Sequence, residues 1–147
     1  MKQTTKRILS LFLAALVLFC FASCKDNAPE TPESSLWSNA LYTEDTELGA
    51  GAKTLIIKVT AEEKSIVFTI NSDAETVGEA LIENSLVEGS EGAFGLYISH
   101  VNGIKAIYEE DGAYWGFSDK DGALMSTGVD MTSFADGDVY ELRYTKE

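Results

Sequence analysis

Apolar and polar residues alternate along much of the chain from residue 53 onward. In residues 53–60 and 66–71 apolar side chains recur at every second position, and the polar segment 61–64 separates the two runs. Successive side chains on a strand point to opposite faces of a sheet, so a period of two predicts strands with one apolar face. The pattern therefore predicts a β-hairpin over residues 53–71.

A helix is expected shortly after this hairpin. Thr76 is followed three residues later by Glu79, which is the spacing of a capping box at the N-terminus of a helix. Val77, Ala80 and Leu81 then lie on one stripe, and Asn84 ends the pattern.

Shorter alternating runs predict further strands over residues 96–101, 113–118 and 139–145. The dipeptide Asn102-Gly103 predicts a tight hairpin turn, because type I′ turns need positive φ at both central residues. Residues 36–42 are expected to dock their aromatic side chains on the domain as an irregular or edge segment, since Trp37 is costly to leave in water.

This order of elements predicts an α+β fold that is β-grasp-like, with one mixed sheet and a single crossover helix on one face. The helix joins the second and third strands, so these two are expected to run parallel with a right-handed crossover. A single helix covers one face only. The alternation assigns the covered face to Leu55, Ile57, Val59, Ile66, Phe68, Ile70, Leu96, Ile98, Trp115, Phe117, Leu142 and Tyr144, and the open face to Lys58, Thr69, Tyr97, Ser99, Tyr114, Gly116, Glu141 and Arg143.

The N-terminus has the organisation of an export signal. Basic residues precede an apolar run over residues 8–19, and the small residues Ala22 and Ser23 stand directly before Cys24. This arrangement resembles the bacterial lipobox, in which the cysteine is acylated and becomes the new N-terminus. Phe21 departs from the leucine that is commoner there, so ordinary secretion with cleavage near Ala22 is the alternative. A retained anchor is disfavoured, because a bilayer span needs about 20 apolar residues.

Three parts are expected: a signal peptide over residues 1–23, a lipid-attached tether over 24–35, and a domain over 36–147 whose core spans 53–146. Both prolines of the chain, Pro29 and Pro32, lie in the tether among acidic and hydroxyl residues. The predicted location is therefore extracytoplasmic, with the protein anchored to a bacterial membrane through lipid on Cys24.

The charge balance limits the class of partner. The chain has 11 Lys and Arg against 24 Asp and Glu, a net charge of −13. Residues 1–23 hold three of the basic groups and no acidic group, so the mature chain would carry −16. Such a chain repels phosphate backbones, and nucleic acid is excluded as an expected partner.

The sequence contains few candidate catalytic residues. His100 is the only histidine, expected as a structural imidazole on the apolar face, and no Gly-x-Ser-x-Gly motif occurs. Asp119-x-Asp121-Gly122 lacks the remaining ligands of an EF-hand loop, so it is interpreted as a turn. We expect no enzyme, no metal site and no resident cofactor.

Several short motifs together resemble one family of bacterial surface domains, the DUF4430 domain. In chain order they are Thr76-x-x-Glu79-Ala80, residues 97–101 with Asn102-Gly103-Ile104, Tyr114-Trp115, Gly128-Val129 and Asp136-Gly137-Asp138. That family is similar to the C-terminal β-domain of intrinsic factor and transcobalamin. The resemblance implies a β-grasp-like fold, extracytoplasmic placement and a face that closes over a corrinoid. The chain encodes no helical barrel like that of the carriers, and Ser118-Asp119-Lys120-Asp121-Gly122 replaces the aromatic strand of many relatives.

The open face supplies the candidate site. Tyr114 and Trp115 are neighbours on a strand and point to opposite faces, so with Trp115 in the core Tyr114 is exposed. Tyr97, Tyr114 and Gly116 are expected to form a flat surface that stacks on a planar ligand. Two functions follow: a membrane-tethered binding module for a corrinoid-like small molecule, or a protein–protein interaction module that presents an open sheet face to another surface protein.

Overall fold

The computed structural model describes residues 35–147. The unit Ser34–Glu147 is compact and has one continuous core, so a fragment with these bounds is expected to fold by itself. The signal peptide, Cys24 and nearly all of the tether lie outside the described residues. The elements are η1 (Leu36–Asn39), β1 (Thr46–Gly49), β2 (Lys53–Ala61), β3 (Lys64–Ser72), α2 (Val77–Glu83), β4 (Val87–Gly92), β5 (Gly95–Val101), β6 (Ile104–Lys105), α3 (Tyr108–Asp111), β7 (Ala113–Asp119), η2 (Val129–Met131) and β8 (Asp138–Lys146).

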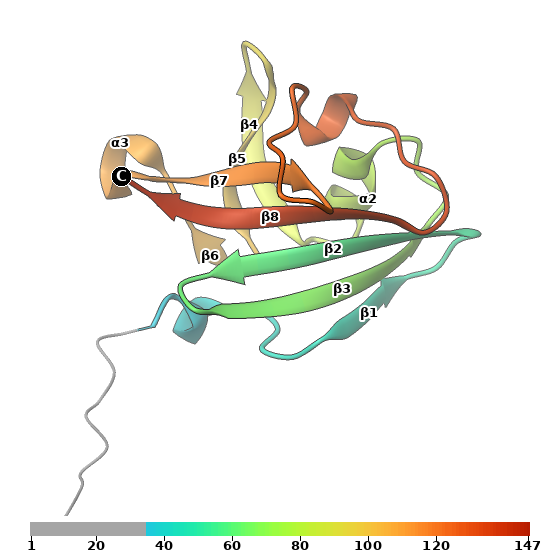
Figure 1. The fold of residues 1–147 in the computed structure, drawn as a ribbon, viewed down its shortest axis with the longest axis horizontal. Helices are drawn as coiled ribbons and strands as arrows, with labels where there is room; N and C mark the ends of the chain where they lie inside the picture. The colour runs from blue at the N-terminus through green and yellow to red at the C-terminus, as the bar shows by residue number, and fades with distance from the viewer. Residues whose placement is uncertain (1–34) are drawn as a thin grey trace, which may run out of the picture. The chain divides into compact units, whose positions relative to one another are not determined.

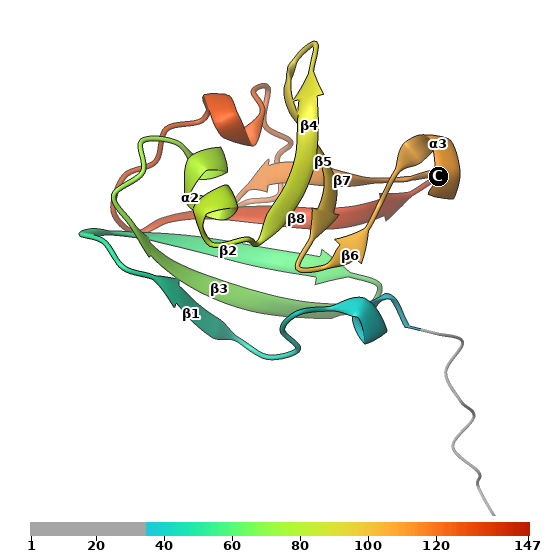
Figure 2. The same ribbon diagram turned by 180° about the vertical axis from the view of Figure 1, so that it is seen from behind.

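The strands form two sheets. A five-stranded mixed sheet has the order β1-β3-β2-β8-β7, in which β1 runs parallel to β3 and β2 runs parallel to β8. A three-stranded antiparallel sheet has the order β4-β5-β6. The small sheet and α2 lie on the same side of the large sheet (Figures 1 and 2). The fold is α+β and consists mostly of strands.

The prediction of one mixed sheet is wrong, and so is the parallel pairing expected across the helix. The segment before β5, for which no strand was predicted, forms β4 and pairs with β5 from Val87↔Val101 to Gly92↔Gly95. Because β4 and β6 occupy the two edges of β5, that strand does not join the large sheet. The open edge of β3 is instead taken by β1, a second strand that was not predicted.

Local predictions are confirmed. β2 and β3 pair antiparallel around a tight turn, with Ala61 opposite Lys64. The side chain of Thr76 accepts from the Glu79 N–H and the Glu79 carboxylate accepts from the Thr76 N–H, which completes the capping box. Asn102 and Gly103 have φ of +53° and +77°, as a type I′ turn requires.

The core lies between the large sheet and the layer formed by α2 and the small sheet. Alternate residues of β2 and β3 are fully buried there, which confirms the predicted apolar face of the hairpin. Leu96 and Ile98 pack against this core from the small sheet. The segment after the tether docks as predicted: the Trp37 side chain is 7% exposed and its Nε1–H donates to the Ala61 carbonyl at 2.9 Å.

Within residues 35–147, no helix has both the length and the apolar character needed to cross a membrane.

Candidate ligand-binding surfaces

The three residues predicted to form one surface belong to different sheets. Tyr114 and Gly116 lie on β7 of the large sheet, whereas Tyr97 lies on β5 of the small sheet. The prediction that they share one open face is therefore wrong. The alternation of Tyr97 was assigned to the large sheet. The strand that carries it, β5, pairs with β4 instead and so belongs to the small sheet.

The outer face of β7 is not the uncluttered strip that was expected at Gly116. Leu124 lies beside this glycine, because a Cβ at position 116 would be 3.7 Å from Leu124 Cδ2. Ser118 and Leu124 form an isolated bridge, and the Met125 N–H donates to the Phe117 carbonyl at 3.0 Å. The loop after β7 thus covers Gly116, while the side chain of Leu124 itself is 74% exposed.

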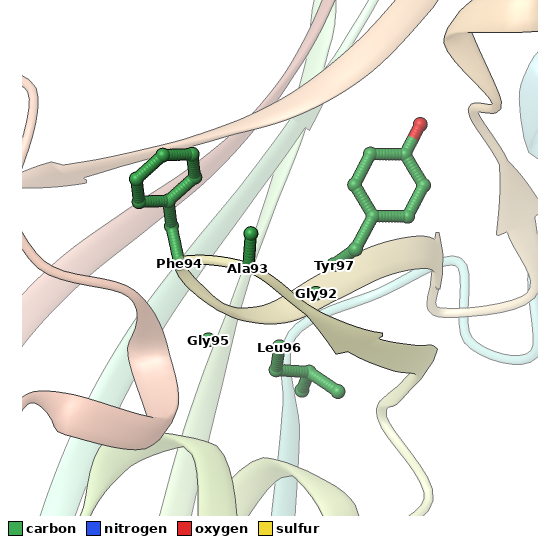
Figure 3. A pocket seen from close by; sticks show the side chains of 6 residues that line it. All are labelled: Gly92, Ala93, Phe94, Gly95, Leu96 and Tyr97. Carbon is green, nitrogen blue, oxygen red and sulfur yellow. The ribbon is translucent and has the colours of Figure 1, made fainter.

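Sequence reasoning missed the aromatic residue that is most exposed in the described part of the chain. Phe94 is in the two-residue turn between β4 and β5, and its side chain is 92% exposed. Ala93, Phe94 and Tyr97 project from one side of the hairpin and Leu96 from the other (Figure 3). Residues 92–97 line a shallow pocket of about 180 Å³. We call Ala93, Phe94 and Tyr97 the hairpin-tip surface.

Contacts with neighbouring elements support this hairpin. The Tyr97 hydroxyl accepts a hydrogen bond from the Tyr108 N–H at 3.2 Å, which orients the tyrosine ring. Asp130 of η2 lies close to the turn, because a Cβ at Gly95 would come within 2.6 Å of Asp130 Oδ1. That oxygen is buried and has no hydrogen-bond partner within residues 35–147. The hairpin is therefore hydrogen-bonded to the start of α3 and lies close to η2.

The outer face of the large sheet carries a charged network around Glu141. The Glu141 Oε1 accepts from the Thr60 hydroxyl at 2.6 Å and from Arg143 Nη2 at 2.8 Å, and Lys58 Nζ lies 3.5 Å away. Burial raises the pKa of Glu141, but these hydrogen bonds and the positive charges of Arg143 and Lys58 outweigh burial and leave it below the ordinary value. The carboxylate is thus stabilised in its charged form on a face that the small sheet does not cover.

A larger groove lies at one end of the large sheet. Leu36, Glu62, Tyr144 and Lys146 line it, and its volume is about 390 Å³. Tyr144 packs edge-on against Trp115, with ring centroids 5.7 Å apart. We call this the sheet-end groove.

His100 lies near the end of β5, on the same alternation as Leu96 and Ile98. Its Nδ1 lies 3.0 Å from the Ser99 hydroxyl and 3.9 Å from Glu88 Oε2, and its side chain is 30% exposed. No group of three or more His, Cys, Asp or Glu side chains in residues 35–147 is placed to hold a metal ion.

The sequence matches no family model and no curated protein. The structure is similar to that of a "putative metal binding protein" from Ruminococcus gnavus ATCC 29149, with a TM-score of 0.60 and 29% identity over 65% of this chain and 99% of that chain. It is also similar to haptocorrin in complex with Cbi (cobinamide), with a TM-score of 0.50 and 18% identity over 67% of this chain. The match spans 26% of haptocorrin, so the likeness concerns one part of that protein and shows a shared fold.

Proposed function

We propose that this chain is an extracytoplasmic, lipid-anchored module that binds a small molecule on the hairpin-tip surface, and that the ligand is corrinoid-like. We also propose that the domain is a DUF4430 member with a β-grasp-like fold. The observation that carries the functional proposal is the side chain of Phe94, 92% exposed at the end of a supported hairpin.

The arrangement of the two aromatic rings fits a planar ligand. Exposed apolar area costs about 25 cal/mol per Å² relative to burial, so a ligand that covers Phe94 recovers free energy. Tyr97 is 38% exposed and projects from the same side of the hairpin (Figure 3). A two-residue turn restricts the backbone, and less entropy is therefore lost on binding.

The ligand would lie over this surface rather than inside it. The pocket at the tip has a volume of about 180 Å³, whereas pockets that enclose a drug-sized ligand have about 300–1,000 Å³. For binding over this open surface alone, we expect a corrinoid to bind no more tightly than micromolar, about −8 kcal/mol. The haptocorrin likeness supports a corrinoid, because that protein was crystallised with Cbi and shares the fold.

The anchor proposal rests on Ala22, Ser23 and Cys24 after an apolar run. Replacing Cys24 with alanine should move the protein from the membrane fraction to the periplasm or the medium. A Cys24→Ala variant that stays equally membrane-bound would contradict lipid attachment at this residue.

Calorimetric titration of the Ser34–Glu147 fragment with cobinamide and cobalamin tests the binding proposal. Phe94→Ala should weaken binding at least tenfold, because it removes the main contact area. Leu124→Ala is the matched control, since Leu124 is also strongly exposed but lies beside Gly116 on the outer face. Tyr114→Ala tests the surface predicted from sequence. Adding Ca²⁺ or Zn²⁺ shows whether the metal-binding description of the Ruminococcus gnavus protein extends to this chain.

Two results would overturn the proposal. If neither corrinoid binds at millimolar concentration, the small-ligand function loses its support and the protein-interaction function replaces it. If Tyr114→Ala or Leu124→Ala abolishes binding and Phe94→Ala does not, the ligand binds the outer face of β7 instead.

A further inference from the structure

The sheet-end groove is formed by three segments that are far apart in sequence. Leu36 comes from η1, Glu62 from the β2–β3 turn, and Tyr144 and Lys146 from the end of β8. β2 and β8 run parallel, so their C-terminal ends lie at the same end of the sheet, where Figure 1 also shows η1. The groove volume of about 390 Å³ falls in the range of small-molecule pockets.

Opposite charges line this groove without neutralising each other. Glu62 and Lys146 both line it, yet neither takes part in an ion pair within residues 35–147, although five pairs between Lys or Arg and Asp or Glu form there. Glu62 Oε2 accepts a hydrogen bond from the Ser35 hydroxyl at 2.9 Å, which restrains the carboxylate. The groove therefore offers one anionic and one cationic contact to the same ligand.

The remaining lining residues are apolar or aromatic. The ring of Tyr144 is held by its edge-on contact with Trp115, whose Nε1–H donates to the Ile104 carbonyl at 3.3 Å. Burial raises the pKa of Tyr144, and the negative charges of Asp111 and Glu62 raise it further. The phenol is therefore neutral at physiological pH and keeps its hydrogen-bond donor.

We infer that the sheet-end groove binds a small zwitterion with an apolar body, of the class of a free α-amino acid with an aromatic or branched side chain. Its ammonium group would contact Glu62, its carboxylate would contact Lys146, and its side chain would lie against Tyr144 and Leu36. Hydrogen bonds between ionised groups are stronger than neutral ones. A ligand with only one charge would desolvate either Glu62 or Lys146 without pairing it.

This site is independent of the hairpin-tip surface. The two surfaces share no lining residue, and they take ligands of different chemistry: a planar macrocycle over the tip, and a compact zwitterion in the groove. Failure of corrinoid binding would therefore leave the groove proposal standing, and the reverse also holds.

NMR titration of the ¹⁵N-labelled Ser34–Glu147 fragment with L-phenylalanine and L-leucine tests the inference. We expect saturable shifts of the backbone amides of the groove residues, with a millimolar or tighter Kd. N-acetyl-phenylalanine lacks the ammonium group and phenylalanine amide lacks the carboxylate, and each should bind at least tenfold more weakly.

Two charge-removing variants assign the contacts. Glu62→Gln should weaken L-phenylalanine binding about tenfold but leave the weak binding of N-acetyl-phenylalanine unchanged. Lys146→Met should likewise weaken the binding of L-phenylalanine about tenfold and leave the weak binding of phenylalanine amide unchanged. Glu63→Gln and Lys120→Met are matched controls, because both side chains are exposed and neither lines the groove.

Three results would overturn the inference. No shift at the groove residues at tens of millimolar amino acid would show that no zwitterion binds there. Equal binding of the single-charge analogues would show that the groove recognises only the apolar body. Shifts confined to residues 92–97 would place the binding at the hairpin tip.

Discussion

The side-chain amide of Asn102 makes two hydrogen bonds with the backbone of Tyr42. The Tyr42 N–H donates to Asn102 Oδ1 at 2.9 Å, and Asn102 Nδ2 donates to the Tyr42 carbonyl at 2.8 Å. Asn102 is fully buried, and its own carbonyl accepts from the Leu41 N–H at 2.9 Å. The turn between β5 and β6 thus holds the segment that links η1 to β1.

Asn102→Asp should lower the free energy of unfolding by about 2–4 kcal/mol, because aspartate cannot donate to the Tyr42 carbonyl and places a charge at a buried position. Urea unfolding of the Ser34–Glu147 fragment measures the loss. Asn39→Asp is the control, since Asn39 is exposed in η1. A loss below about 0.5 kcal/mol would mean that the two hydrogen bonds do not stabilise the fold.

Gly103→Val should destabilise by about 2–5 kcal/mol for two reasons. Its φ is +77°, which costs a β-branched residue about 1–2 kcal/mol, and a Cβ would lie 2.6 Å from the Asn39 carbonyl oxygen. Gly122→Val separates the two effects, because Gly122 has a φ of +84° and nothing lies within 4 Å of its Cβ position. Thermal melting of both variants should show the larger loss at position 103, and equal losses would exclude the clash.

Phe68→Ala should cost about 3–5 kcal/mol, since Phe68 is fully buried and contacts the edge of the Tyr42 ring with centroids 5.7 Å apart. Phe94→Ala makes the same chemical change at an exposed site and should leave the free energy of unfolding nearly unchanged. Guanidinium unfolding compares the two. A cost below about 1 kcal/mol at Phe68 would contradict the position of the core.

Glu141→Gln should make stability depend differently on pH. The folded-state pKa of Glu141 lies below its ordinary value of about 4.5, so its stabilising contribution is present above that value and is lost as the pH falls through the folded-state pKa. We expect wild type to exceed the variant by about 1–3 kcal/mol at neutral pH. Unfolding at a series of pH values should show this difference shrinking below about pH 4.5. Glu63→Gln, at an exposed position, is the control and should change the free energy of unfolding by a small amount that does not depend on pH. If the difference between wild type and Glu141→Gln also stays constant with pH, the contacts of Glu141 do not stabilise its charged form.

Local interactions made several elements predictable from sequence. The capping box of α2 depends on residues three apart, the type I′ turn on Asn102 and Gly103, and the β2–β3 hairpin on alternation around a short connection. In each of these the partner groups are near in sequence, so the pattern itself contains the interaction.

Pairing between distant strands decided the rest. Alternation shows which side chains share a face of one strand, but it contains no information about which strand lies at each edge. β4 was missed because its glycines and exposed glutamates show no alternation. Without β4, there was no reason in the sequence to place Tyr97 and Tyr114 in different sheets. Phe94 could have been found only by recognising its two-residue turn. The sheet-end groove combines Leu36, Glu62, Tyr144 and Lys146 from three segments. The parallel pairing of β2 with β8 and the docking of Trp37 on Ala61 bring them to one end of the sheet.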